Sequence, residues 1–563
     1  MGTAELPTTT GRAAALGAST FCEAFQITAA ERPDQVALRS FGSGTAITFA
    51  DYAQRVRAIA TGLYALGVRR GDTVGIMLVN RPEFHLADMA AIHLGATPFS
   101  IYNTSSPEQI EYLFSNAQNA VVISERKFLP VLDEARTPGV RHVISVDGDG
   151  DMTLDELEHS RAAGFDFDEA WRAIRPDDVL TLIYTSGTTG PPKGVELTHA
   201  NVLTVIRAIA AVLPTTPGGR VISYLPSAHI ADRVNAHYSC STCFGLEVTS
   251  VADIGDLAAA LAQVHPTVWV AVPRVWEKIM AALQAGGVTE PASMPEEARA
   301  AVRARIGLDQ AEWSVSGAAP IPEEVLRFYL DLGVPICEVW GMSEGSAVST
   351  CMPPDGIRIG SVGKALPGIE IRLLDDGEIL VRGDTVMKGY RGDPAKTAET
   401  IDADGWLHTG DIGRVDDDGY VWIVDRKKEL IINAAGKNMS PANIEQKVKA
   451  SSPLIGQAIC VGDRRPHNVA LLTIDPDAAA KFAADHGCSA DPAELRERED
   501  VQAEIARGVD AANARLSRVE QIKRFTILPV DWQPGGDELT PTMKLRRKPI
   551  HAKYAAEIET LYD

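Results

Sequence analysis

Residues 181–199 read TLIYTSGTTGPPKGVELTH, so an apolar run leads into a loop of small residues that ends at a lysine. Glycines such as Gly187 let the backbone approach a ligand closely and turn its N–H groups toward an anion. Pro191 and Pro192 stiffen the end of the loop, which carries the point charge of Lys193 on a defined arm. Further donors are the hydroxyl groups of Thr185, Ser186, Thr188 and Thr189. The stretch predicts a loop that binds the phosphate chain of a nucleotide.

This loop differs from the commonest phosphate-binding loop, which has the pattern GxxxxGK followed by Ser or Thr. The place of the second glycine is taken by Pro192, and Lys193 is followed by Gly194 rather than by a hydroxyl residue. The sequence therefore disfavours phosphoryl transfer of that type. The alternative is a plain polar loop, which would not explain why glycine, hydroxyl residues, proline and lysine occupy these positions.

The flanks of the loop indicate an α/β fold. Short apolar runs such as DTVGIMLV (72–79), AVVIS (120–124) and DDVLTLIY (177–184) alternate with helical segments. Asn80 is expected to cap one helix and Thr198 the helix that follows the loop. Strands that alternate with helices predict mostly parallel sheets covered by helices on both faces.

The pattern changes after about residue 355. Two segments, 368–383 and 413–432, place an Asp-Gly turn between strand-like runs, which predicts antiparallel hairpins and a small β-rich subdomain. The charged run DRKKE (425–429) is either a solvated turn or a hinge between domains. We predict an N-terminal domain over 1–424, a hinge at 425–428 and an α+β C-terminal domain over 429–563.

Composition excludes several function classes. A net charge of −21 over 563 residues argues against nucleic acid or an anionic membrane surface as a partner. No apolar run reaches the roughly 18–20 residues of a transmembrane helix, and the N-terminus is not typical of a signal peptide. Seven scattered cysteines favour a reducing cytoplasm. Cys240 and Cys243 form a CxxC pair, which we interpret as packed thiols; the alternatives are metal binding or redox chemistry.

The loop and several later segments resemble, in order, the motifs of the acyl-adenylate-forming enzymes, which include acyl-CoA synthetases, adenylation domains and luciferases. The resemblance covers nearly the whole chain. The later segments are SGAAPIP (316–322), VWGMSE (339–344), GWLHTGDIG (405–413), DRKKELIINAAGKNMSPANIE (425–445) and LTPTMKLRR (539–547). Within that superfamily, YLPSAHIADRVNAHY (224–238) and VPRVWEKI (272–279) are most similar to long-chain and bubblegum-type fatty acyl-CoA synthetases.

The resemblance implies a large N-terminal domain of layered sheets and a small mobile C-terminal domain. It also implies a function: ATP activates a carboxylic acid, most similarly a long-chain fatty acid, to acyl-AMP with release of pyrophosphate. CoA then accepts the acyl group, and Mg²⁺ assists the first step. The expected co-substrates and cofactor are thus ATP, CoA and Mg²⁺.

The resemblance also implies roles for individual residues. Lys544 would bridge the substrate carboxylate and the α-phosphate, His229 would lie beside the carboxylate, and Lys193 would hold the outgoing phosphates. Mg²⁺ would bind Thr185 and Glu344. The remaining nucleotide and CoA contacts are expected from Ser186, Gly187, Thr188, Thr189, Gly317, Ala318, Trp340, Gly341, Ser343, Asp411, Arg426, Lys428, Gly436 and Lys437. Trp340 stands where the family more often has Tyr, so the ring is retained and the hydroxyl is lost.

Two alternatives stay open. One is a fatty acyl-AMP ligase or adenylation enzyme that passes the acyl group to a carrier protein. The other is a non-catalytic protein that binds ATP or an acyl chain; the retention of Lys544, Glu344 and Asp411 argues against it. The expected location is the cytoplasm, with peripheral contact to a membrane as an option, because long acyl chains partition there.

Overall fold

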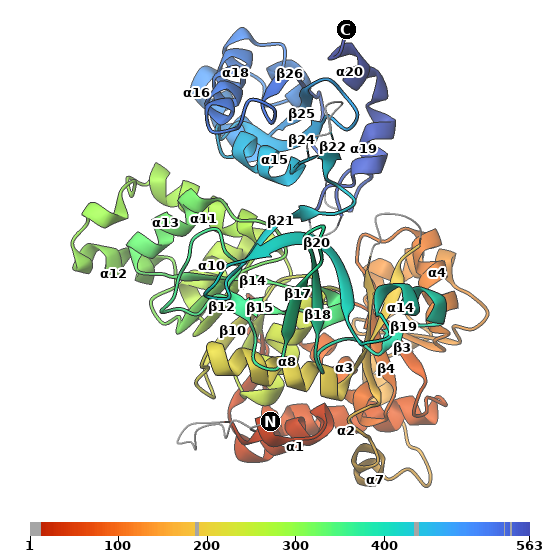
Figure 1. Cartoon of the computed structure of the whole chain (residues 1–563). Coiled ribbons are helices and arrows are strands. Elements are labelled where there is room, and N and C mark those ends of the chain that lie inside the picture. Colours follow the sequence, from red (N-terminus) through yellow and green to blue (C-terminus); the bar gives the residue numbers. More distant parts are fainter. Residues whose placement is uncertain (1–12, 186–190, 433–437, 534, 541–542) are drawn as a thin grey trace. The chain divides into compact units, whose positions relative to one another are not determined.

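The computed structural model describes residues 13–185, 191–432, 438–533, 535–540 and 543–563. The described chain forms two compact units. Unit 1 comprises residues 1–318, 325–371 and 380–408, and unit 2 comprises residues 319–324, 372–379 and 409–563. Figure 1 shows the elements coloured along the chain.

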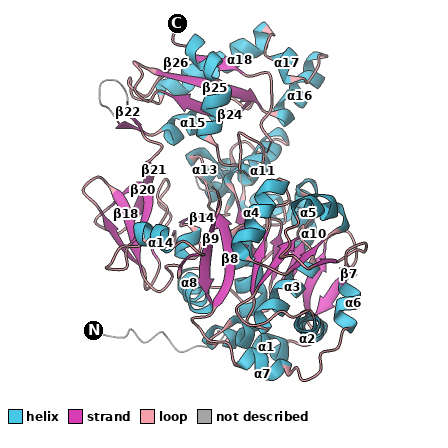
Figure 2. Ribbon diagram, turned by 90° about the vertical axis from the view of Figure 1, so that its right-hand side faces the viewer, coloured by secondary structure: helices cyan, strands magenta, loops and turns pink. Residues whose placement is uncertain are grey.

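The largest sheet of unit 1 has the strand order β19-β9-β8-β4-β3-β5-β6-β7. Its strands are β3 (Thr73–Met77), β4 (Thr97–Ser100), β5 (Val121–Ser124), β6 (His142–Ser145), β7 (Met152–Thr153), β8 (Val179–Thr185), β9 (Lys193–Thr198) and β19 (Gly389–Tyr390). Strands β3 to β8 pair in parallel, whereas β9 is antiparallel to both β8 and β19. The predicted α/β sheet is confirmed, and Figure 2 shows β8 and β9 side by side within it.

Two further sheets belong to unit 1, and most of their pairs are also parallel. Their orders are β10-β11-β1-β2 and β12-β13-β14-β15-β16. The strands are β1 (Val36–Ser40), β2 (Ala46–Thr48), β10 (Arg220–Ser223), β11 (Glu247–Ser250), β12 (Val268–Ala271), β13 (Trp313–Ser316), β14 (Ile336–Trp340), β15 (Thr350–Cys351) and β16 (Lys364–Ala365).

Helices cover both faces of the large sheet. Apolar side chains of α4 and α5 pack on β3, β4, β5, β6 and β8 on one face. Helix α3 contacts β3 and β4 and also β1 of the neighbouring sheet, and all its residues except Glu83 are buried. The helices in this part of the chain are η1 (Ala14–Gly17), α1 (Phe21–Glu31), α2 (Phe49–Ala65), α3 (Pro82–His93), α4 (Pro107–Ala117), η2 (Arg126–Phe128), α5 (Leu129–Ala135), α6 (Leu154–His159), α7 (Phe167–Arg172), α8 (His199–Val212), α9 (Ile230–Asp232), η3 (Arg233–Cys243), η4 (Ile254–Asp256), α10 (Leu257–Val264), α11 (Pro273–Ala285), η5 (Pro291–Ser293), α12 (Glu296–Arg305), α13 (Glu323–Leu332), η6 (Ser343–Gly345) and α14 (Pro394–Thr400).

The two predicted helix caps had different outcomes. Thr198 caps α8 as expected, because its side chain accepts the N–H of Asn201 in a complete capping box. The prediction for Asn80 was wrong: the N-cap of α3 is Arg81, without a side-chain cap. Asn80 instead donates its amide N–H groups to Ser223 Oγ at 3.0 Å and to the Leu225 carbonyl at 2.8 Å. Its preference for local capping is overridden by these long-range bonds.

Unit 1 also contains a buried charged group, the Asp88 cluster, formed by Asp88, Arg233, His237, His85 and Ser100. Arg233 pairs with Asp88, both side chains fully buried, and donates to Ser100 Oγ at 2.7 Å. His237 Nε2 lies 3.1 Å from Asp88 Oδ1, and its Nδ1 lies 2.9 Å from His85 Nδ1. Arg233 and His237 belong to η3, which is a π-helix, and His85 and Asp88 belong to α3. The cluster therefore fixes η3 against α3.

Unit 2 is built on the sheet β24-β25-β26, which has a hydrophobic core on each face. Helices α15 to α18 supply one core, and the C-terminal helices α19 and α20 supply the other (Figure 1). The elements are β22 (Ile431–Ile432), β23 (Asn438–Met439), α15 (Pro441–Lys449), β24 (Ile455–Val461), β25 (Asn468–Ile474), α16 (Pro476–His486), α17 (Pro492–Leu495), α18 (Glu499–Ala514), β26 (Ile522–Ile527), α19 (Arg547–Lys553) and α20 (Ala555–Thr560). The predicted α+β character of this part of the chain is confirmed.

The predicted hairpins form one more sheet, in the order β17-β18-β20-β21. Its strands are β17 (Glu370–Leu373), β18 (Glu378–Arg382), β20 (Leu407–Val415) and β21 (Val421–Arg426). Strands β20 and β21 are antiparallel, with Asp411 opposite Arg426.

All seven cysteines lie in the described part of the chain and carry free thiols, and all but the partly exposed Cys488 are buried. Burial raises the pKa of Cys243 to about 12 and that of Cys240 further. A thiol with a raised pKa forms little thiolate and is inert. The interpretation of Cys240 and Cys243 as packed thiols is thus supported.

Candidate active site

The predicted phosphate loop is anchored by a pair of strands. Thr185 ends β8, Lys193 begins β9, and the two residues are register partners across the antiparallel pair. Lys193 therefore has a position set by strand pairing. Four of the predicted loop residues lie outside the described part of the chain, namely Ser186, Gly187, Thr188 and Thr189.

Two further predicted segments follow neighbouring parallel strands. Gly317 and Ala318 come directly after β13, and Gly341 comes after β14, so both segments leave the same edge of the sheet. A Cβ at position 317 would lie 2.7 Å from Val339 Cγ2, and one at 341 would lie 2.3 Å from the Ala347 carbonyl oxygen. Only glycine allows this close packing. The carboxyl edge of a parallel sheet is the usual place for a bound nucleotide.

Trp340, Ser343 and Glu344 belong to the second of these segments. Trp340 is the last residue of β14, and its ring is largely buried, with 9% of the residue exposed. Ser343 and Glu344 form the short helix η6 that follows, and both are buried. These predicted residues are thus brought together on one turn of chain.

Tyr390 connects Glu344 with Lys193. Its hydroxyl group donates to Glu344 Oε1 at 2.8 Å, and the ammonium group of Lys193 lies 5.0 Å from the centre of its ring. Burial and the nearby Glu344 carboxylate raise the pKa of Tyr390, so the phenol stays protonated and keeps donating. The structure therefore places a carboxylate, a phenol and an ammonium group in sequence.

Sequence reasoning missed Tyr390. It lies in KGYRGDP (388–394), where an aromatic residue between Gly389 and Gly392 is the only local signal. The residue reaches the site because β19 pairs with β9, with Tyr390 opposite Val195.

Glu344 and Thr185 suit magnesium by their chemistry. Mg²⁺ prefers hard oxygen ligands and is usually bound by one or two carboxylates together with substrate phosphates and water. The described residues contain no group of three or more His, Cys, Asp or Glu able to hold a metal ion. A magnesium ion bound here would take a carboxylate oxygen from Glu344, a hydroxyl oxygen from Thr185 and its other ligands from a bound nucleotide and water.

His229 lies in the first of the two predicted acyl segments, 224–238. It is the N-cap of α9, and its Nδ1 accepts the N–H of Ala231 at 3.2 Å, which fixes the orientation of the ring. The same loop carries Tyr224, which stacks on Trp269 at a centroid distance of 5.3 Å. Trp269 in turn meets Trp276 of α11 edge to face at 6.4 Å. The segments 224–238 and 272–279, far apart in the sequence, therefore join in one aromatic row.

Asp232, three residues after His229, is a buried carboxyl group that sequence reasoning did not single out. Burial raises its pKa to about 7, although Ser223 Oγ donates to Oδ2 at 2.8 Å. This bond ties Asp232 to Ser223, the last residue of β10.

In unit 2, the two residues predicted to bind a ribose lie together. Arg426 Nε lies 2.7 Å from Asp411 Oδ1, and the two residues are cross-strand partners. Asp411 is buried, whereas the Arg426 side chain is 46% exposed. A fixed carboxylate with two oxygens is suited to accept hydrogen bonds from vicinal hydroxyl groups.

The remaining predicted residues lie at the hinge and in the C-terminal part of the chain. Lys544 is exposed, and two hydrogen bonds join it to Thr540: the Lys544 N–H donates to Thr540 Oγ1 at 3.0 Å, and the Thr540 N–H donates to the Lys544 carbonyl at 2.8 Å. Lys428 is exposed between two residues that form ion pairs, Lys427 and Glu429. Gly436 and Lys437 lie outside the described residues.

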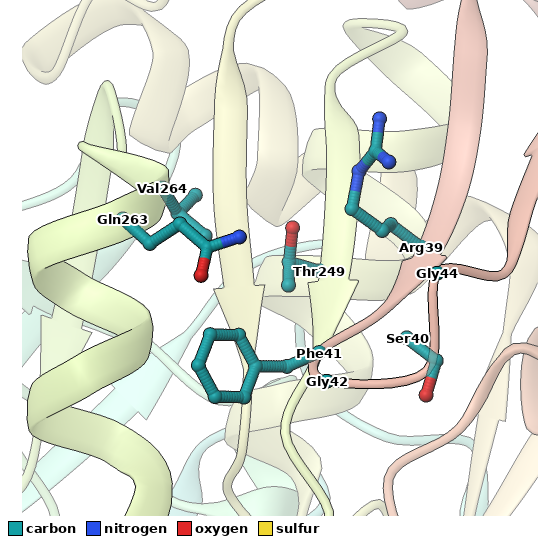
Figure 3. A pocket seen from close by; sticks show the side chains of 8 residues that line it. All are labelled: Arg39, Ser40, Phe41, Gly42, Gly44, Thr249, Gln263 and Val264. Atoms are coloured by element: carbon teal, nitrogen blue, oxygen red, sulfur yellow. The ribbon is translucent and has the colours of Figure 1, made fainter.

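The pocket drawn in Figure 3 lies elsewhere in unit 1 and contains none of the predicted site residues. It measures about 270 Å³ and opens beside the ends of β1 and β11 and the end of α10. Arg39, which contributes to it, is already paired with Glu247 at 2.6 Å. The residues around it are Arg39, Ser40, Phe41, Gly42, Gly44, Thr249, Gln263 and Val264.

Comparisons with known proteins agree with the motif order. The sequence model of the AMP-binding enzyme family matches residues 25–391, and that of the AMP-binding enzyme C-terminal domain matches residues 428–563. The putative fatty-acid–CoA ligase fadD11 of Mycobacterium tuberculosis is 52% identical over 73% of this chain and 79% of its own length. The long-chain-fatty-acid–CoA ligase FadD15 of Mycobacterium bovis is 36% identical over 94% of this chain and 95% of its own.

A solved structure shares the fold. It is the anthranilate CoA ligase AuaEII in complex with anthranoyl-AMP, with a TM-score of 0.78 over 99% of this chain and 100% of that chain. The sequence identity is 19%, so this likeness concerns the fold alone.

Proposed function

Because the chain belongs to the AMP-binding enzyme family, we propose that it activates long-chain fatty acids with ATP and transfers the acyl group to CoA. In the first step a carboxylate oxygen attacks the α-phosphorus of ATP, and the bond to pyrophosphate breaks. In the second step the CoA thiolate attacks the acyl carbon and AMP leaves. The observation that supports the proposal is the Glu344–Tyr390–Lys193 arrangement, in which Tyr390 links a carboxylate to the lysine that begins β9.

Within this function, unit 1 supplies most of the nucleotide contacts. Glu344 and Thr185 would hold Mg²⁺, which neutralises phosphate charge when bound. Lys193, with the hydroxyl groups and backbone of Ser186, Gly187, Thr188 and Thr189, would hold the departing β- and γ-phosphates. Ser343 would donate to the α-phosphate. The adenine would lie along Gly317 and Ala318 with Trp340 and Gly341, and His229 would orient the fatty carboxylate.

Unit 2 would supply the remaining groups. Asp411 and Arg426 would bind the ribose, and Lys544 would neutralise the carboxylate and α-phosphate as they meet. Residues 425–428 would act as a hinge with Lys428 at the pivot, dividing an N-terminal domain (1–424) from a mobile C-terminal domain (429–563). Gly436 would admit the pantetheine arm of CoA, and Lys437 would meet its phosphates.

We also propose a cytoplasmic location, supported by the free thiols of all seven cysteines. Among the residues that the structure describes, none of the helices is long and apolar enough to cross a bilayer. Peripheral contact with a membrane would give the enzyme access to long acyl chains dissolved there.

A pyrophosphate-release assay tests the proposal. The purified full chain is given ATP, Mg²⁺ and fatty acids of graded length, with and without CoA, and products are identified by mass spectrometry. We expect release that depends on a long-chain acid, and acyl-CoA when CoA is present. Acyl-AMP that accumulates in the presence of CoA would point to a carrier protein as the acceptor. No release with any acid would contradict the proposal.

The roles of Glu344 and Tyr390 have separate signatures. Glu344→Gln should lower the rate of adenylation by about 10²-fold or more and raise the Mg²⁺ concentration needed for half-maximal rate. Tyr390→Phe removes one hydrogen bond to the Glu344 carboxylate, worth about 1.5–3 kcal/mol, but leaves the carboxylate in place, so it should slow adenylation with a smaller change in the Mg²⁺ requirement than Glu344→Gln causes. An unchanged Mg²⁺ requirement in Glu344→Gln would remove Glu344 from the metal site.

A further inference from the structure

Arg547 forms a charged group in unit 2 that the proposed function does not use. This Arg547 cluster comprises Arg547, Glu445 and Glu429. The guanidinium group donates through Nη1 and Nη2 to the two oxygens of Glu445, at 2.5 and 2.7 Å, and through Nε to Glu429 Oε2 at 3.1 Å. Only 14% of the Arg547 side chain is exposed. A two-point pair of this kind fixes direction as well as distance.

The cluster is firmly attached to the body of unit 2. Glu445 lies on α15, is buried, and its Oε1 also accepts the backbone N–H of Cys460 in β24 at 2.7 Å. Arg547 is the first residue of α19, whose Ile550 packs in the core on the other face of the sheet. Arg547 thus joins α15 to α19.

The run 425–429 divides its contacts in an ordered way. Arg426 pairs with Asp411, and Lys427 pairs with Glu378 at 2.8 Å and with Asp376 at 2.6 Å, all on the sheet β17-β18-β20-β21 or its turns. The residues at the ends bind the α15–α19 body instead. Asp425 Oδ2 accepts Ser440 Oγ at 2.6 Å and the Ala442 N–H at 3.1 Å, and Glu429 binds Arg547.

This division leaves Lys428 between two attachments. The residues just before it are held by the β-sheet, and the residue just after it is held by Arg547. A rotation about the backbone of Lys428 that leaves Lys427 with Glu378 would carry Glu429 and Arg547 together, and it would have to break the bonds from Asp425 to Ser440 and Ala442.

Lys544 is tied to the same body three residues before Arg547. The residues on either side of it pair with one another: Leu539 bridges to Leu545, and the Arg546 N–H donates to the Glu538 carbonyl at 2.8 Å. Glu538 is in turn held by Lys553 of α19 at 2.5 Å. The place of Lys544 is therefore set by α19, and the first side chain of α19 is Arg547.

We propose that Arg547 is a positioning residue for Lys544. Through Arg547, the position of Glu429 next to the pivot determines the position of the segment that carries the lysine. The inference rests on the proposed function, because it assigns to Arg547 an effect on the step that Lys544 serves. Arg547 touches no substrate in this scheme. It keeps the segment around Lys544 at a fixed position relative to Glu429, the residue after the pivot.

The proposal predicts an effect on one half-reaction only. Misplacing a catalytic group by about 1 Å can cost about 10²-fold in rate. Arg547→Lys keeps the charge but loses the two-point pair, so adenylation should fall about 10- to 100-fold. Formation of acyl-CoA from supplied acyl-AMP does not need Lys544 in place, and its rate should change by less than about 2-fold on the same argument.

The experiment measures both half-reactions in the full chain. Adenylation is followed by ATP–pyrophosphate exchange with a fatty acid, and thioester formation is followed with synthetic acyl-AMP and CoA. The variants are Arg547→Lys, Glu429→Gln, Lys544→Ala and the double variant Arg547→Lys/Lys544→Ala. Glu429→Gln weakens the cluster without leaving a buried charge unpaired, so it serves if Arg547→Lys does not fold. Glu559→Gln, which breaks an exposed pair with Arg465 in the same unit, is the matched control.

The double variant separates positioning from structure. If Arg547 acts through Lys544, Arg547→Lys should change exchange by less than about 2-fold once Lys544 is alanine. Equal losses in both half-reactions, or losses that multiply in the double variant, would overturn the inference while leaving the proposed function intact. A wild-type chain without exchange for any acid would instead remove the proposed function.

Discussion

The Asp88 cluster of unit 1 and the Arg547 cluster of unit 2 use the same chemistry for different ends. Each pairs an arginine with one or more carboxylates from a distant part of the chain: Arg233 with Asp88, and Arg547 with Glu445 and Glu429. The Arg233 and Asp88 side chains are fully buried, whereas Arg547 is 14% and Glu429 25% exposed. The first cluster joins two layers of one body, and the second lies beside the pivot of a predicted hinge. A fully buried ion pair stabilises one arrangement of the fold, whereas a partly exposed pair beside a hinge can couple the hinge to a neighbouring segment.

The two clusters also differ in what completes them. Around Asp88 the remaining partners are neutral, because burial lowers the pKa of His237 and His85 well below the usual value. A carboxylate can only accept, so His237 Nε2 carries the proton and its Nδ1 accepts from His85. Around Arg547 a second carboxylate, Glu429, takes that place, which leaves the cluster with a net negative charge.

Lowering the pH should give the largest difference in stability between the two units. Burial lowers the pKa of four histidines of unit 1, to about 3 for His199, to about 4 for His93, and well below the usual value for His85 and His237. Above pH 6.5 both the folded and unfolded states are neutral at these residues. Below it only the unfolded state binds protons at these four residues, so the free energy of unfolding falls by up to about 1.4 kcal/mol per pH unit for each histidine, and Asp232, with a pKa raised to about 7, offsets one of them.

Hydrogen exchange between pH 7 and pH 5, corrected for the intrinsic rate, measures this difference in the full chain. Unit 2 has His551, whose pKa burial also lowers, and should lose less protection than unit 1. Equal losses of protection in the two units would contradict the predicted difference in their acid stability.

Asp88→Ala should be the most damaging single substitution of the two clusters. It leaves the Arg233 charge buried without its partner, which costs about 3–5 kcal/mol of unfolding free energy. Urea denaturation of the variant and the parent chain gives this value. Glu399→Ala is the control, because it breaks the exposed Lys396–Glu399 pair and should cost less than about 1 kcal/mol. A cost for Asp88→Ala close to that of the control would show that the sealed pair does not fix unit 1.

Glu445→Gln should cost less than Asp88→Ala, about 1–3 kcal/mol, because Arg547 keeps Glu429 and some contact with water. We expect the loss of hydrogen-exchange protection to be confined to α15, β24 and α19. A loss that spreads through unit 1, or a cost above that of Asp88→Ala, would contradict the contrast between a sealed and a marginal cluster.

Glu559→Gln should have the smallest effect. Its pair with Arg465 has side-chain exposures of 59% and 36%, so the expected cost is below about 1 kcal/mol and should vanish in high salt. The same urea titration at low and high ionic strength measures it. A larger cost that persists in high salt would mean that solvent exposure does not predict how much these ion pairs contribute to the free energy of unfolding.

Local patterns predicted the parts of the fold that are locally determined. The strand before the phosphate loop, the Thr198 cap and the Asp-Gly hairpins each follow from a short run of residues. The pairing of Asp411 with Arg426 brings together two residues that the family resemblance had named for one task.

The rest depended on contacts between distant segments, which no local pattern records. Tyr390 meets Glu344 only because β19 pairs with β9, and Asn80 gives up its cap for Ser223 and Leu225. In the sequence Arg547 is one of three consecutive basic residues that follow Lys544 closely. Its partners, Glu445 and Glu429, lie about a hundred residues earlier, and only folding shows that they converge.

The distribution of the thiols has a practical consequence. Six cysteines are buried, and burial raises the pKa of each of them, so they resist alkylation at neutral pH. Cys488, just after α16 in unit 2, is the remaining partly exposed thiol. A maleimide dye should therefore attach at one place in the wild-type chain. The native sequence supplies an optical reporter of the C-terminal part during turnover, without any engineered cysteine.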